Sequence, residues 1–270
     1  MKKAFLVIAL LAVLPAVSHS ADAMFEEEDE EERPLKTSLF LYPFVEEYRW
    51  MEFFDGGQIL EEKGELYGAG AQATFERGPS LYRLKGEYFQ GKVDAEGVTQ
   101  LGFPWTTEVS YYGFRLEADG AWRFPVGPVS LAPVMGVGYK WWRRDFENSP
   151  TVAGGLEKWH TFYLKLGALG ECDLGNGIVP YAEAGFRLGV FNNNEIDYNG
   201  GRVSLDPGGR LTPYAEVGLT AGFLKAGAYY ERMEFSQSSP ELAIGLPPGW
   251  GLVQPEVKVN IYGARVGVVF

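Results

Sequence analysis

Alternation of apolar and polar side chains at the end of the sequence constrains the fold more than any other feature. Residues 256–270 read EVKVNIYGARVGVVF. One parity gives Tyr262, Ala264, Val266, Val268 and Phe270, and the other gives Ile261, Gly263, Arg265, Gly267 and Val269. Because side chains alternate across a β-strand, the stretch is predicted to be one long strand. One of its faces is apolar and ends on an aromatic ring, and the other carries glycine and arginine.

Nine earlier segments alternate in the same way, which predicts about ten strands in all. They span 37–53, 64–76, 80–92, 107–122, 128–145, 158–173, 178–191, 210–222 and 225–236. After a first connection at 54–63, tight links at 77–79, 124–127, 174–177 and 223–224 alternate with long ones at 93–106, 146–157, 192–209 and 237–254. Strict alternation favours an even strand number. Eight or twelve strands also fit, since 192–209 has room for another hairpin at 202–205.

Composition agrees with strands that cross a membrane. Aromatic residues make up 15% of the chain and there are 35 glycines, yet the mean hydropathy is only −0.13. Beyond the first residues there is no apolar run of about 20 residues, the length that a transmembrane helix needs. Alternating strands distribute their apolar residues among polar ones, so a membrane barrel has an ordinary average hydropathy. Cys172 is the single cysteine, which excludes an intrachain disulfide.

The N-terminus is predicted to contain an export signal and an acidic spacer. Lys2 and Lys3 precede an apolar run over 4–17 and a group of small residues, the pattern of a secretory signal peptide. Cleavage after Ser20 or after Ala23 fits this pattern. Residues 26–32 are all acidic, and adjacent carboxylates repel one another too strongly to be buried. The predicted organisation is a signal peptide over 1–23, a disordered acidic tail over 24–36 and a barrel over 37–270.

The signal peptide, the alternating strands and the terminal Phe270 together resemble Gram-negative outer-membrane β-barrel proteins. The resemblance implies an all-β fold, a closed antiparallel transmembrane barrel located in the cell outer membrane. In that family the assembly machinery recognises the terminal strand, which pairs with the first strand. The implied assembly signal is Phe270, Val268, Val266 and Tyr262. The implied partners are outer-membrane lipid and the barrel assembly machinery.

Parity divides the strands into two faces. The apolar face carries Leu84, Tyr88, Tyr112, Phe114, Leu116, Trp122, Met135, Val137, Tyr139, Trp141, Phe162, Leu164, Leu166, Phe186, Leu188, Val217 and Leu219. The charged face carries Arg83, Lys85, Glu87, Arg115, Glu117, Lys140, Lys165, Glu171, Glu183, Arg187, Glu216, Glu231 and Arg265. Aromatic residues concentrate near strand ends, as interfacial belts require. The apolar face is therefore predicted to contact lipid.

The charged face predicts a filled lumen. Its core set is Lys85, Glu87, Arg115, Glu117, Lys165, Glu183, Arg187, Glu216 and Arg265. An eight-stranded barrel is just filled by side chains, and ten strands give little more room. A network of ion pairs that closes the lumen is favoured over a narrow, porin-like channel for small solutes.

Sites for other chemistry are weak. His160 is the single histidine beyond the signal peptide and shares parity with apolar residues, so it is predicted on the lipid face. The sequence predicts no catalytic residue, no metal site and no cofactor, and an enzyme is the least favoured function. The oxygen-rich residues 192–197 are interpreted as a mobile loop rather than a calcium site. The acidic balance, −12 over the whole chain, argues against nucleic acid. The predicted function is a structural or surface-interaction role, and the sequence identifies no ligand for the loops.

Overall fold

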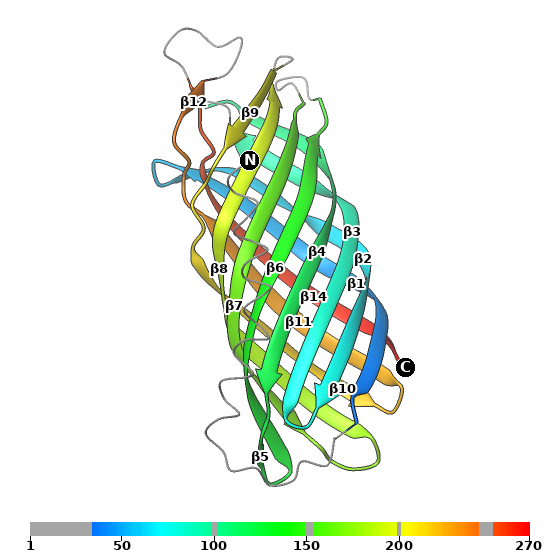
Figure 1. The fold of residues 1–270 in the computed structure, drawn as a ribbon. Helices are drawn as coiled ribbons and strands as arrows, with labels where there is room; N and C mark the ends of the chain where they lie inside the picture. The colour runs from blue at the N-terminus through cyan, green and yellow to red at the C-terminus, as the bar shows by residue number, and fades with distance from the viewer. Residues whose placement is uncertain (1–33, 99–101, 149–153, 199–200, 243–250) are drawn as a thin grey trace. The chain divides into compact units, whose positions relative to one another are not determined.

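Ten strands close into an antiparallel β-barrel (Figure 1). The computed structural model describes residues 34–98, 102–148, 154–198, 201–242 and 251–270. The barrel strands are β1 (Lys36–Phe54), β2 (Gly57–Arg77), β3 (Ser80–Val98), β4 (Pro104–Trp122), β6 (Val129–Phe146), β7 (Leu156–Cys172), β8 (Ile178–Tyr198), β10 (Leu211–Ala221), β11 (Leu224–Phe235) and β14 (Glu256–Val269). The described part of the chain holds no helix with the length and hydropathy of a membrane span.

The first and last strands pair with each other, so the barrel has no open edge. β1 and β14 are antiparallel from Phe40 opposite Val269 to Phe53 opposite Glu256. The pairing continues through the terminal residue, because the amide of Phe270 donates to the Leu39 carbonyl at 3.0 Å. A closed sheet satisfies every strand's backbone groups within the protein, which is the condition for placing β-structure in lipid.

The two ends of the barrel are built differently. At one end, here called the turn end, short turns join β2 to β3, β7 to β8 and β10 to β11, and a small hairpin of β5 (Phe124–Val126) with β6 joins β4 to β6. The opposite end, the loop end, carries β9 (Gly201–Leu205), which pairs with β8, and a separate pair, β12 (Glu241–Leu242) with β13 (Gly251–Leu252). The hairpin considered for 202–205 is thus present. The predicted signal peptide and the predicted tail up to residue 33 lie outside the described residues, and Lys36, the last residue of the predicted tail, already belongs to β1.

Three connections at the loop end are shorter than the sequence predicted. β1 and β2 are joined by a tight turn at Asp55–Gly56, whose φ angles of 49° and 79° suit a two-residue hairpin. β2 therefore begins at Gly57, whereas the sequence predicted a connection over 54–63. β3 likewise continues to Val98 and β8 to Tyr198. The strands run on because their alternation persists, although the polarity of the two faces is exchanged.

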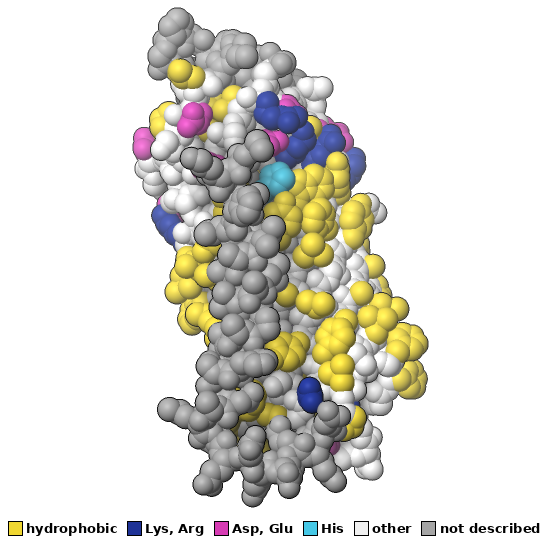
Figure 2. Space-filling model, viewed as in Figure 1, with side chains coloured by type: hydrophobic (Ala, Val, Ile, Leu, Met, Phe, Trp, Pro, Cys, Tyr) yellow, Lys and Arg dark blue, Asp and Glu magenta, His cyan; other side chains and the backbone are white. Residues whose placement is uncertain are grey.

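This exchange of polarity is visible within β3. Towards the turn end its outward residues are apolar, with Tyr82, Leu84 and Tyr88 being 48%, 54% and 50% exposed. Its next outward residues are Gln90, Lys92, Asp94 and Glu96. The inward face changes the other way, from Arg83, Lys85 and Glu87 to Phe89, Val93 and Ala95. Figure 2 shows the result on one face of the molecule, an apolar surface that gives way to charged side chains near the loop end.

The barrel thus consists of two halves with opposite polarity. The turn-end half is apolar outside and charged inside, as a lipid-embedded barrel is. The loop-end half has a charged outer wall and a buried apolar core that includes Trp50, Trp142 and Trp159, each at most 1% exposed. The loop-end half is therefore built like a water-soluble barrel, with apolar residues inside.

Candidate functional site

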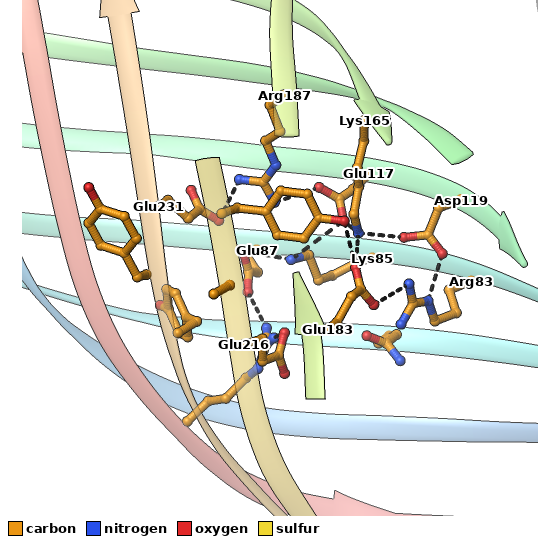
Figure 3. A pocket seen from close by; sticks show the side chains of 16 residues that line it. Arg83, Lys85, Glu87, Glu117, Asp119, Lys165, Glu183, Arg187, Glu216 and Glu231 are labelled. Atoms are coloured by element: carbon orange, nitrogen blue, oxygen red, sulfur yellow. Dashed lines mark hydrogen bonds and ion pairs between the residues drawn. The ribbon is translucent and has the colours of Figure 1, made fainter. Parts of the chain in front are cut away.

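A network of ion pairs fills the lumen of the turn-end half (Figure 3). Glu117 on β4 accepts from Lys165 on β7 at 2.8 Å and from Arg187 on β8 at 2.9 Å. Arg187 also contacts Glu231 on β11 at 2.7 Å. The side chains involved are at most 10% exposed. Three separate parts of the barrel wall are therefore linked through the interior.

Arg115 extends this network across the lumen. Its guanidinium lies 2.5 Å from Glu46 on β1 and 2.9 Å from Glu87 on β3. β4, which carries Arg115, is separated from β1 by two strands, so the contact with Glu46 crosses the barrel rather than following the sheet. Arg265 on β14 then contacts Glu87 at 3.3 Å and pairs with Glu216. Each of these side chains meets an opposite charge, as buried ions favour.

The predicted lumen residues all point into the barrel interior. These are Lys85, Glu87, Arg115, Glu117, Lys165, Glu183, Arg187, Glu216 and Arg265, and each has an ion pair with an opposite charge. Two further carboxylates, Glu46 and Asp119, belong to the network and were not predicted. Asp119 shares parity with Arg115 and Glu117, which is the signal that could have identified it.

Inward tyrosines supply a second set of bonds that the sequence analysis missed. The donor–acceptor pairs are Tyr42 with Glu87 (2.8 Å), Tyr163 with Glu117 (2.9 Å), Tyr181 with Glu216 (2.7 Å), Tyr214 with Glu183 (3.1 Å) and Tyr229 with Glu46 (2.7 Å). The rings lie flat against the wall over glycine. A Cβ atom on Gly138 would lie 2.1 Å from the Tyr163 ring, so glycine is required for that close approach.

An aromatic cluster lies in the barrel interior on the loop side of the network. Trp142 and Trp159 are stacked, with ring centroids 5.5 Å apart and an interplanar angle of 9°. Trp50 meets Trp159 edge-on at 5.1 Å, and Phe235 lies 5.2 Å from Trp159. We call Trp50, Trp142, Trp159 and Phe235 the aromatic plug. Its members come from β1, β6, β7 and β11 and so span the interior.

Arg144 is embedded beside the aromatic plug. It is fully buried, and its guanidinium lies 4.0 Å from the centre of the Trp50 ring. It contacts Glu52 at 3.2 Å and Glu157 at 2.7 Å, and it also pairs with Glu62. A buried arginine with three carboxylates and an aromatic face has its charge well compensated. It therefore links carboxylates of β1, β2 and β7 beside the plug.

Only small cavities remain within the network. One of about 30 Å³ lies among Lys85, Glu117 and Glu183, and another of about 30 Å³ lies near Lys140 and Met233. Each has room for about two water molecules, since one water needs roughly 10–15 Å³ of such space. A larger cavity of about 480 Å³ lies at the turn end, lined by residues that include Leu169 and Lys225.

His160 lies on the outer face of β7, where the lipid-facing surface ends. Its Nδ1 atom is 2.7 Å from the Tyr139 hydroxyl on the neighbouring strand.

Residues 192–197 form part of β8, so their interpretation as a mobile loop was wrong. Alternation turns Asn194 inward to Gln254, at 2.7 Å, while Asn193 bonds Asp206 at 2.9 Å on the outer side. Among the described residues no cluster of His, Cys, Asp or Glu is arranged to hold a metal ion.

The residues of the implied assembly signal lie along the outer face of β14. Tyr262 is 56% exposed, Val266 is 55% exposed and Phe270 is 72% exposed, with Val268 between the last two. This face continues the apolar surface of the turn-end half. Recognition by an assembly machinery stays a prediction.

Comparisons with known proteins identify the fold. No family model matches the sequence, and no curated protein matches it. Among solved structures, the outer-membrane protease OmpT from Escherichia coli has a TM-score of 0.59 at 7% identity, over 92% of this chain and 99% of that one. The translocator domain of the autotransporter NalP from Neisseria meningitidis covers 95% of this chain and 96% of its own, at 14% identity and a TM-score of 0.43. At these identities the likeness concerns the fold alone, and the fold of this chain is that of a Gram-negative outer-membrane β-barrel.

Proposed function

We propose that this protein is a non-conducting outer-membrane barrel with a structural or surface-interaction role. The observation that supports this most is the aromatic plug. It lies in series with the ion-pair network, so a solute crossing the lumen would have to displace both. Displacing a buried ion pair costs several kcal/mol, about 3–5 when one partner is removed.

The loop-end half supports a role at the cell surface. Its outer wall carries ion pairs between neighbouring strands, such as Arg49 with Glu61 at 2.8 Å and Lys158 with Asp197 at 3.3 Å. Such residues are stable in water and not in hydrocarbon. This half therefore projects beyond the outer leaflet and presents a rigid, charged wall to whatever lies outside.

We also propose that the role is not catalytic. His160 bonds to Tyr139 on the outer face, away from the interior carboxylates. OmpT is a protease, but a common fold does not carry an activity with it. The interior carboxylates of the network are bound to arginine and lysine side chains, so they are engaged in ion pairs rather than free to act on a substrate.

Conductance separates the non-conducting barrel from the narrow channel. Purified protein in planar bilayers should show little or no steady current, and liposomes that contain it should not swell in small sugars. A variant that truncates the plug, Trp142→Ala with Trp159→Ala, should give small or flickering currents because it empties the loop side of the lumen. The matched control is Trp141→Ala, which truncates a neighbouring outward indole and should stay silent.

Stable channels in the wild-type protein would reject this proposal in favour of a porin-like channel. Silence in both the wild type and the plug variant is the result expected if the ion-pair network alone suffices to close the lumen. With that result the barrel would still be non-conducting, but the ion-pair network rather than the aromatic plug would be the part that closes the lumen.

A further inference from the structure

Two interior lysines lack the carboxylate partner that the other interior bases have. Among the described residues, no carboxylate oxygen lies within 4.0 Å of Lys140 or Lys225, whereas Lys165 has three such partners. Lys140 borders a cavity of about 30 Å³ and lies 4.0 Å from the Met233 sulfur. Lys225 borders the cavity of about 480 Å³ at the turn end. Only the second space is large enough for a molecule other than water.

The large cavity has the character of a ligand site. It is lined by apolar side chains, among them Phe40, Leu81, Leu169 and Val269, and by hydroxyl-bearing ones, among them Thr74 and Thr220. Gly127 and Pro128 of the β5–β6 turn also line it, which places it at the turn end of the lumen. Its volume falls in the range of small-molecule pockets, about 300–1,000 Å³.

Most other charges around this cavity have an ion-pair or hydrogen-bond partner. Arg123 contacts Glu76 and Glu171, each at 2.9 Å. Glu216 pairs with Arg265 and accepts from Tyr181. Asp173 is occupied by the turn, since it accepts from the Gly175 amide at 2.8 Å.

Lys225 is the exception among these charges. Its ammonium lies 4.5 Å from the Tyr181 ring centre and 5.4 Å from that of Phe40. Aromatic faces attract a cation but do not neutralise it. Among the described residues that line the cavity, Lys225 is thus an ammonium with no ion pair, close to apolar side chains.

We propose that the turn-end cavity binds a small organic monocarboxylate with an apolar body. The carboxylate would pair with the Lys225 ammonium, since a charge-assisted hydrogen bond is the strong interaction available there. The apolar body would lie along Leu81 and Leu169, which belong to one apolar cluster, where burial of its surface favours binding. The ligand enters from the turn end, the periplasmic side of an outer-membrane barrel. The site does not depend on whether the lumen conducts.

Calorimetry with a charged probe and its neutral analogue tests the proposal. The barrel is placed in lipid nanodiscs and titrated with 4-phenylbutyrate and, separately, with 4-phenylbutyramide, and the heats of empty nanodiscs are subtracted. The carboxylate should bind at least about tenfold more tightly than the amide, because the charged contact is worth about 1.5–3 kcal/mol. Equal binding of the two probes, or binding of neither, would overturn the proposal.

Three variants locate the site. Lys225→Met should remove the preference for the carboxylate, because it keeps the length of the side chain and deletes the charge. Lys36→Met removes a charge from an exposed position at the same end of the barrel and should leave binding unchanged. Thr74→Trp keeps Lys225 but fills the cavity, so neither probe should bind. Heat-modifiable migration on gels confirms that each variant is folded.

Two results with these folded variants would place binding elsewhere and contradict the site. One is an unchanged carboxylate preference in Lys225→Met. The other is undiminished binding in Thr74→Trp.

Discussion

At the residue scale, the interior charges are held by several partners rather than in isolated pairs. The Lys165 ammonium lies 2.8 Å from Glu117, 2.8 Å from Asp119 and 2.9 Å from Glu183. Each of these carboxylates has further bonds, so the loss of one member exposes several others. Removing one partner of a buried pair typically costs about 3–5 kcal/mol.

A double-mutant cycle on Lys165 and Glu117 measures this coupling. Lys165→Ala and Glu117→Ala should each lower the free energy of unfolding by about 3–5 kcal/mol. The double variant should cost less than the sum of the two, by about 0.5–3 kcal/mol, because the two side chains contact each other. Urea unfolding in lipid vesicles gives the three values.

The control is the pair Arg49 and Glu61 on the outer wall, which has the same 2.8 Å distance but side chains that are 48% and 29% exposed. Alanine at either position should cost at most about 1 kcal/mol, since water screens an exposed pair. Additive losses for Lys165 and Glu117 would mean that these charges do not meet in the folded barrel.

At the element scale, the outer face of a strand tolerates charge only beyond the apolar surface. Val266 on β14 lies in the apolar surface and is 55% exposed. Val266→Arg should destabilise the folded barrel by about 2–4 kcal/mol if this position lies near the bilayer midplane. Deletion of Phe270 should lower the yield of folded barrel in the outer membrane, because the implied assembly signal ends on that ring.

The matched substitution for Val266→Arg is Glu96→Arg. Glu96 points outward from β3 in the loop-end half, where an arginine meets water, so its stability should be close to that of the wild type. Membrane yield and gel migration of the folded form report on all three variants. Equal stability of the two arginine variants would mean that the apolar surface does not face lipid.

At the scale of the whole molecule, the exchange of polarity predicts which half is outside the cell. In a Cys172→Ser background, Asp94→Cys on the loop-end half should react with a membrane-impermeant maleimide on intact cells. Leu84→Cys faces outward from the same strand, β3, but from the apolar surface, and it should stay unlabelled. Labelling of Asp94→Cys only after the outer membrane is opened would place the loop end in the periplasm.

The sequence predicted the strands and the barrel fold better than it predicted two other features. These are the level along each strand at which the polarity of the faces is exchanged, and the contacts across the lumen. Alternation assigned each residue to a face, and the resemblance to outer-membrane barrels implied that the sheet closes, with its apolar face towards lipid. Alternation does not say at what level along the strand the two environments are exchanged. Val93 and Ala95 were therefore read as part of a loop, although they lie in the core at 2% and 0% exposure.

Contacts across the lumen could not be predicted from the sequence, for a different reason. Arg115 and Glu46 are 69 residues apart, on strands that are not neighbours. Their meeting depends on the stagger of all ten strands around the barrel, and alternation carries no information about stagger. The inward tyrosines, by contrast, share parity with their charged neighbours, as Tyr163 does with Lys165. Their inward direction could therefore have been predicted from the sequence.

The exchange of polarity occurs next to an aromatic or aliphatic residue on several strands. Glu47 follows Val45 on β1, Gln90 follows Tyr88 on β3, and Arg143 follows Trp141 on β6. Movement of the barrel along the membrane normal in one direction would carry these polar side chains into hydrocarbon, and movement in the other would expose the apolar ones to water. The vertical position of the barrel is therefore fixed from both sides. When the bilayer is thinner or thicker than the apolar surface, the lipid around the protein must stretch or compress to relieve the hydrophobic mismatch.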